Sequence, residues 1–263
     1  MVRRSGSFLI NPLTIVFIIL AFIFNKFYFL FLHYLIAFIH EFFHFTMAKF
    51  LKIEVEEITF LPIGFYLKIN GLEDYSFIKQ FLVLISGPLS FFFSFLMLKI
   101  LYNLNVISIY GYQEGIISNN FILIFNLLPI YPLDGSKLIE LFLAPFYSEY
   151  KLRIIRVILS ILTLVIASSY LLSLGEFIIM IFLFITTIVS LIRLKKDYIL
   201  YLISRLTKRS ERKIRINKKK EIYRLKDNYF LENNKLMNEN EIISQIVFSN
   251  QLKTKRDGKQ EKN

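Results

Sequence analysis

The chain has 263 residues, of which 55% are hydrophobic and 29 are phenylalanine, and its formal net charge is +12. Soluble domains are typically about 45–50% apolar, whereas several apolar runs here reach or approach the ~20 residues that cross a bilayer. The composition therefore excludes an ordinary soluble domain and indicates a polytopic membrane protein. The chain contains no cysteine, so histidine and carboxylate side chains would have to hold any metal ion.

Six apolar segments are predicted to cross the membrane, which gives an all-α fold with about six transmembrane helices. The first segment follows a basic start but precedes no Ala-x-Ala-like cleavage site, so we interpret it as a retained span. The fourth contains three asparagines, which indicates a helix packed inside the bundle. The segments cover residues 8–24, 27–50, 81–102, 115–131, 154–172 and 175–192.

The distribution of basic residues predicts the orientation. Lysine and arginine collect in cytosolic loops under the positive-inside rule. If all six segments span the membrane, nearly all basic residues fall on one side, and only Lys26 and Lys99 fall on the other. Both termini are therefore expected in the cytosol, and the protein is expected in a cell membrane as a multi-pass protein.

Residues 52–71, KIEVEEITFLPIGFYLKING, are predicted to form a small β-hairpin or sheet at the cytosolic membrane surface. Strand-forming residues alternate partly with polar ones in this stretch. Pro62 and Gly64 interrupt its middle, as expected of a turn. A plain loop is the alternative interpretation.

The predicted domains are a transmembrane domain, residues 1–197, and a short basic cytosolic tail, residues 198–263. From Arg193 onward the chain has 20 Lys and Arg against 9 Asp and Glu, a net charge of +11. Basic residues beside a last span favour contact with anionic lipid headgroups. Nucleic acid is not an expected partner, because aromatic residues do not interleave with the basic ones. A small amphipathic helix is expected within 240–252.

The stretch Ile39-His40-Glu41-Phe42-Phe43-His44 places two imidazoles and a carboxylate inside an apolar run. Ionisable groups are costly at bilayer depth and usually mark function there. Residues four apart lie on one helix face, so both rings can reach one metal ion. Glu41 is off that face but close to it, as in the His-Glu-x-x-His arrangement of two ligands and a general base. The alternative is that the histidines are polar contacts between helices.

A catalytic zinc site usually needs a third protein ligand. His33 lies seven residues before His40, about 10 Å along a helix, which is too far to share the ion. Asp134 is the candidate, in the sequence NLLPIYPLDG at 126–135. Two prolines before Asp134 end the helix, and Gly135 after it allows a close backbone approach. An ordinary N-cap role for Asp134 is the alternative.

The two motifs together resemble the site-2 protease family of intramembrane zinc metalloproteases. HEFFH is followed about ninety residues later by Asn-x-x-Pro-x-x-Pro-Leu-Asp-Gly, and FLPIGFYLKI and ISGPLSFF resemble further stretches of the family. More narrowly, the chain resembles the family's stage IV sporulation branch, whose members process a membrane-tethered precursor of a late sigma factor. The resemblance covers about residues 8–200.

The resemblance implies a role for each matching residue. His40, His44 and Asp134 would bind one Zn²⁺ per chain, and Glu41 would act as the catalytic base. Residues expected to support the site or bind substrate are Asn126, Pro129, Pro132, Gly135, Pro62 and Gly64. The strand segment around 61–69 would pair with an unwound substrate by strand addition.

The resemblance also implies partners and a location. The expected substrate is a membrane-tethered protein cleaved near the cytosolic face, a pro-sigma factor in the sporulation branch, and inhibitory membrane proteins are possible further partners. The location would be an internal membrane around the forespore. Phe43 and Ser136 stand where many relatives have glycine. The tail is short for the nucleotide-sensing domain of sporulation relatives, and KLMNENEIISQIV would be a truncated remnant of it.

Three other functions are weighed against a sporulation protease. A metal-handling or transport protein would use His40, His44 and Asp134 as a transit site and would not need Glu41. Against it, the six segments show no internal repeat, which transporter folds often have. An inactive relative would act as a scaffold, but the complete set of catalytic residues argues against that. A site-2 protease acting on a different regulatory substrate is the third alternative.

Overall fold

A computed structural model describes residues 7–10, 12–61, 64–69, 71–173, 177–207, 213–217, 219–232 and 235–248. The chain forms two compact units. Unit 1 comprises residues 1–72, 78–128 and 133–138, and unit 2 comprises residues 73–77, 129–132 and 139–263. The predicted boundary at 197/198 stays a prediction, and the two units are described separately.

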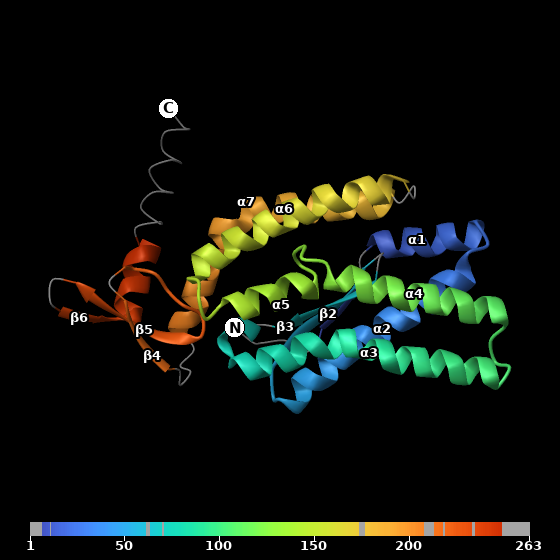
Figure 1. The fold of residues 1–263 in the computed structure, drawn as a ribbon, viewed down its shortest axis with the longest axis horizontal. Coiled ribbons are helices and arrows are strands. Elements are labelled where there is room, and N and C mark those ends of the chain that lie inside the picture. Colours follow the sequence, from blue (N-terminus) through green and yellow to red (C-terminus); the bar gives the residue numbers. More distant parts are fainter. Residues whose placement is uncertain are drawn as a thin grey trace. The chain divides into compact units, whose positions relative to one another are not determined.

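Unit 1 is built on helices whose apolar faces pack around a small core. Ile36, Ala37, Leu98 and Ile122 are buried together and join three of the helices. The side-chain oxygen of Ser108 accepts a hydrogen bond from the Gly111 N–H at 3.2 Å, which caps one helix. The helices are α1 (Pro12–Ile23), α2 (Phe27–Phe50), α3 (Phe77–Asn103), α4 (Ile109–Leu127) and the first half of α5 (Asp134–Leu143) (Figure 1).

A three-stranded sheet packs against α2 in unit 1. Its order is β1-β2-β3, with β1 (Ser7–Ile10) parallel to β2 (Val55–Leu61), which pairs antiparallel with β3 (Gly64–Ile69). The β2–β3 pair confirms the predicted hairpin. Gly64 has φ +150°, and a Cβ atom there would lie 3.3 Å from the Ala37 Cβ on α2. Among the described strands, β3 is an edge strand, so one row of its backbone groups is unpaired within the sheet.

Two of the described helices, α2 and α3, are long and apolar enough to cross a membrane. The six-span topology therefore stays a prediction. Its first span, 8–24, is wrong at its beginning because residues 8–10 belong to strand β1, and α1 has 12 residues. The misassigned stretch is apolar, and an apolar run of this length does not by itself distinguish a strand from a helix.

Unit 2 contains the antiparallel helices α6 (Glu149–Ser173) and α7 (Phe177–Thr207), which lie side by side in Figure 1. A second sheet follows, with the order β4 (Lys213–Asn217), β5 (Lys226–Glu232), β6 (Lys235–Asn238), and residues 239–248 are helical. This sheet was not predicted, whereas the helix overlaps the one expected within 240–252. The buried core that joins them to α7 is Tyr201, Leu202, Ile222, Phe230, Ile242 and Ile243.

A buried network of arginines and glutamates also holds unit 2 together. The guanidinium of Arg224 donates to Glu149 at 2.8 and 3.0 Å and to Glu140 at 3.3 Å. Arg153 contacts Glu149 at 2.9 Å and Glu73 at 3.1 Å. The network therefore ties the segment before β5 to α5 and α6, so part of the predicted tail is packed within unit 2. We call Glu73, Glu140, Glu149, Arg153, Arg156 and Arg224 the arginine–glutamate cluster.

Candidate metal centre

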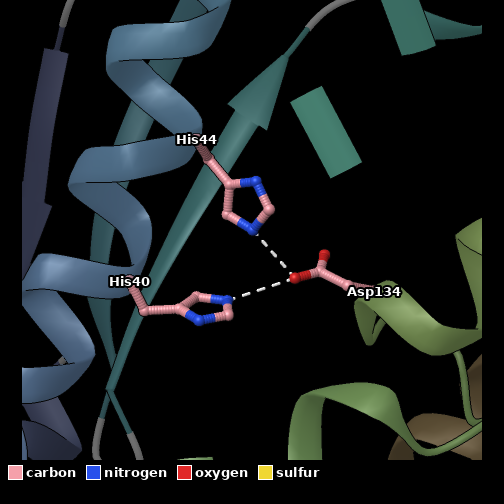
Figure 2. Close-up of side chains that lie close together, drawn as sticks. All are labelled: His40, His44 and Asp134. Carbon is pink, nitrogen blue, oxygen red and sulfur yellow. Dashed lines mark hydrogen bonds and ion pairs between the residues drawn. The ribbon is translucent and has the colours of Figure 1, made fainter. Parts of the chain in front are cut away.

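The helix α2 places His40 and His44 one turn apart on its buried face. The two side chains are 3% and 5% exposed, and their ring centroids are 4.9 Å apart. Figure 2 shows both imidazoles extending from α2 toward Asp134. The helical spacing of four residues therefore brings two ring nitrogens to one place, as expected from the sequence.

Asp134 is the first residue of α5 and meets both rings with a single oxygen. Its Oδ2 lies 2.8 Å from the His44 Nε2 and 3.2 Å from the His40 Nε2 (Figure 2). Asp134 is 6% exposed and is separated from His40 by 94 positions in the chain. The ligand atoms of the three residues all lie within 4.8 Å of one another. The structure thus brings together the three residues that the sequence proposed as metal ligands.

Gly135 allows α5 to begin close to the end of α4. A Cβ atom at this position would lie 2.1 Å from the Leu127 carbonyl oxygen and 2.7 Å from that of Leu128. These neighbours are backbone atoms and cannot rotate away, so a side chain at 135 would push the start of α5 from its place. The close backbone approach expected of Gly135 is therefore present, and it requires glycine at the position next to Asp134.

The other nitrogen of His44 is held by α3. Its Nδ1–H donates to the Val83 carbonyl oxygen at 2.6 Å, and the Ser86 hydroxyl lies 3.4 Å from the same nitrogen. A neutral imidazole has one N–H, so this bond leaves a lone pair on Nε2. That lone pair faces a carboxylate oxygen at 2.8 Å. When His44 is neutral, its Nε2 and the carboxylate oxygen are both acceptors, and a cation between them, either a proton or a metal ion, would satisfy both.

The donor set fits zinc. Zn²⁺ is bound by histidine nitrogen and carboxylate oxygen at about 2.0–2.2 Å, and tetrahedral ligands at that distance lie roughly 3.3 Å apart. The observed separations from Asp134 Oδ2, 2.8 and 3.2 Å, are near this value. The Val83 contact supplies the outer hydrogen bond that a metal-bound histidine usually makes. Three protein ligands would leave a fourth position open, as in catalytic zinc sites.

Lys137 contacts the second oxygen of Asp134. Its Nζ lies 3.2 Å from Asp134 Oδ1 and 5.9 Å from the ring centre of Tyr66 on β3. The two carboxylate oxygens therefore face different partners, since Oδ2 faces the imidazoles and Oδ1 the ammonium group. Sequence reasoning did not single out Lys137, although its position three residues after Asp134 on a helix was a usable signal.

The other predicted site residues lie in varied places. Glu41 follows His40 on α2 and is half-buried; the candidate metal ligands among the described residues do not include it. The Asn126 side-chain nitrogen donates to the Ile122 carbonyl within α4 at 2.9 Å. His33 on α2 hydrogen-bonds to Ser118 on α4 at 2.9 Å, which is a polar contact between two helices. Pro62 lies outside the described residues.

Pro129 and Pro132 lie in unit 2, where α6 contacts the segment between them. The Tyr131 N–H donates to the Ser160 hydroxyl oxygen at 3.1 Å. The guanidinium of Arg156 stacks over the Tyr131 ring at 4.1 Å from its centre. Both prolines are half-buried, and their predicted support of the site stays a prediction.

Comparisons with known proteins include a sequence relative and a solved structure. No family model matches the chain. It is 29% identical over 111 residues to stage IV sporulation protein FB of Bacillus subtilis (strain 168), covering 41% of this chain and 38% of that protein. The chain thus matches less than half the length of this relative.

The solved structure is the site-2 protease from Methanocaldococcus jannaschii. The TM-score is 0.56 at 20% identity, over 72% of this chain and 91% of that one. The fold of the chain is therefore that of a site-2 protease.

Proposed function

We propose that the chain is an intramembrane zinc metalloprotease that cleaves a membrane-tethered protein near the cytosolic face. The observation that carries the proposal is the convergence of His40, His44 and Asp134 on one point, from two segments separated by 94 positions. The sporulation relative and the site-2 protease fold support the same reaction class.

Each residue of the centre has a separate role in the proposed hydrolysis. A zinc ion held by His40, His44 and Asp134 would lower the pKa of water to about 7 and polarise a peptide carbonyl. Glu41, beside His40 on α2, takes a proton from the attacking water and delivers it to the leaving amine. Val83 holds His44 in the tautomer whose Nε2 is free for a metal. Lys137 holds the outer oxygen of Asp134.

The substrate must present an extended peptide to this centre. A helical substrate has its carbonyls bonded within the helix, so it must unwind first. Within the described sheet, β3 is an edge strand and offers backbone groups for an extended segment to pair with. We propose that the segment 61–69 binds the substrate in this way, with Gly64 at its start packed close to α2.

The proposed substrate is a membrane-tethered pro-sigma factor during sporulation, in an internal membrane around the forespore. The name of the sequence relative supports a role in sporulation, and the motif at residues 126–135 is the feature whose resemblance indicates this substrate class. Membrane inhibitors and anionic headgroups are further proposed partners. A site-2 protease acting on another regulatory protein is the alternative within the same reaction class.

The test is co-expression of the chain with a candidate membrane-tethered pro-sigma factor. Glu41→Gln is expected to stop cleavage while zinc stays bound, because the change removes the proton acceptor and leaves the three ligands. Glu114→Gln is the matched control, since Glu114 is an exposed glutamate on α4, and it is expected to cleave as the wild type does. Undiminished cleavage by Glu41→Gln would show that Glu41 is not the base.

Metal removal tests the ion separately. A chelator is expected to stop cleavage by the purified enzyme in detergent, and added zinc chloride is expected to restore it. Cleavage that continues after the bound metal has been removed, as measured by mass spectrometry, would contradict the metalloprotease proposal.

A further inference from the structure

The backbone of α3 lies directly against the two metal-facing nitrogens at Gly87. A Cβ atom built on Gly87 would lie 2.1 Å from the His44 Nε2 and 2.7 Å from the His40 Nε2. These are the two nitrogens that approach Asp134 Oδ2. The glycine and the serine before it are buried. A methyl group at position 87 would therefore overlap both rings beside their Nε2 atoms.

The distances are too short for any packing contact. Non-bonded carbon and nitrogen atoms stay more than 3 Å apart, so a Cβ atom 2.1 Å from one ring nitrogen and 2.7 Å from the other would overlap both rings. The same Cβ atom would lie 2.5 Å from the His44 Cε1, so it would meet the side of that ring. Gly87 leaves room for the two rings because it has no side chain.

The same face of α3 also orients one of the rings. Val83 and Gly87 are four residues apart and so lie on one side of the helix. The Val83 carbonyl binds Nδ1 of His44 at 2.6 Å, and Gly87 leaves room at Nε2 of that ring. One turn of α3 thus sets the tautomer of His44 through Val83 and leaves room for the same ring at Gly87.

We propose that Gly87 is a positioning residue of the metal centre, which leaves room for both imidazole rings against α3 and so lets their Nε2 atoms meet Asp134. The inference rests on the proposed function, in that it assumes the centre binds a metal. It assigns a role to the Gly-Pro-Leu stretch of α3, which until this point was noted only for its resemblance to a stretch of the site-2 protease family. A larger residue at 87 displaces the rings and so separates the metal ligands.

The test compares Gly87→Ala with Gly115→Ala. Gly115 is also a buried helical glycine, but a Cβ there would meet the side chain of Leu98, at 2.7 Å from its Cδ2. Alanine favours helix more than glycine does, so neither change opposes helix formation. Each protein is purified in detergent, dialysed against buffered zinc chloride and measured for zinc per chain. We expect Gly87→Ala to bind zinc roughly tenfold or more weakly, and Gly115→Ala to bind it as the wild type does.

A second measurement needs no metal. The melting temperatures of the metal-free proteins are compared for Gly87→Ala alone and for Gly87→Ala in a His40→Ala/His44→Ala background. The methyl group meets the rings only when they are present, so we expect it to lower the melting temperature in the first case and much less in the second.

The outcomes separate this inference from the proposed function. A wild-type chain that binds no zinc would overturn the metalloprotease proposal. Full zinc binding by Gly87→Ala would overturn the role of Gly87 and leave that proposal intact. Equal changes in melting temperature in the two backgrounds would overturn the role of Gly87 even if the wild type bound no zinc.

Discussion

The chain has two buried clusters of charged and polar side chains, which differ in how donors and acceptors are matched. In the arginine–glutamate cluster, guanidinium N–H groups donate hydrogen bonds to carboxylates. For example, the Arg224 Nε donates to Glu149 at 2.8 Å. Three arginines and three glutamates balance one another in charge in this cluster. In the metal centre, one carboxylate oxygen lies 2.8 and 3.2 Å from the Nε2 atoms of two imidazoles, which are groups that can bind a metal ion.

This difference indicates which cluster is structural and which is functional. A buried ion network with its charges paired holds elements in place and requires no further group. A buried carboxylate between two imidazoles has the ligand set of a zinc site, and a cation bound between them would balance its charge. The arginine–glutamate cluster therefore stabilises unit 2, and the metal centre offers the ligands that the proposed zinc ion needs. Substitutions in the two clusters should have different consequences.

The largest expected effect is that of Asp134→Asn. The change keeps the size of the side chain and removes the charged oxygen that both imidazoles approach. We expect cleavage to fall by more than the ~10–100-fold that is typical of groups that only support a ligand, with a corresponding loss of bound zinc. Cleavage assays with zinc analysis measure both. Full zinc occupancy in Asp134→Asn would contradict the role of Asp134 as a ligand.

The next effect is on stability and concerns the other cluster. Glu149 is 0% exposed, and Glu149→Ala leaves Arg224 and Arg153 without their shared carboxylate. Breaking a buried ion network by removing one partner typically costs about 3–5 kcal/mol. We expect a loss of this size in the free energy of unfolding, measured by denaturant titration in detergent. Lys151→Ala removes an exposed ion pair with Glu221 and should show no measurable change.

A smaller effect is expected at Lys137, which contacts the second oxygen of Asp134. Lys137→Met removes the ammonium group from Asp134 Oδ1 and lets the carboxylate rotate away from the imidazoles. Groups that orient a metal ligand typically contribute 10–100-fold, and we expect a fall in cleavage of about that size. Lys137→Arg keeps the positive charge and should restore most of the activity. An unchanged rate in Lys137→Met would show that the Lys137 contact does not position Asp134.

The sequence was sufficient for those features that short-range patterns encode. His40 and His44 are four apart on a long apolar helix, so their shared face followed from helix geometry. Asp134 was identified because two prolines and a glycine surround a lone carboxylate after an apolar segment. The β2–β3 hairpin followed from strand-forming residues on both sides of Pro62 and Gly64.

The features that the sequence did not predict depend on contacts between distant residues. Arg224 was one of 20 basic residues after position 192, and nothing local showed that it would meet Glu149, 75 positions away. The strand β1 has the sequence SFLI, which is mostly apolar and so resembles the start of a span. Gly87 acquires its significance only from the imidazoles that α2 brings beside it.

The smallest expected effect is the pH dependence of stability that arises from Glu149. Burial by itself would raise its pKa, but the charges of Arg224 and Arg153 outweigh burial and hold the pKa at about 2, below the usual 4.5. A lowered pKa in the folded state stabilises the protein above pH 4.5, and this contribution is lost as the pH falls toward 2, by roughly 1.4 kcal/mol per pH unit. Glu149→Gln does not titrate at this position. We therefore expect the gap in the free energy of unfolding between the wild type and Glu149→Gln to narrow from pH 6 to pH 3.5, and a constant gap would show that Glu149 is not held ionised by the two arginines.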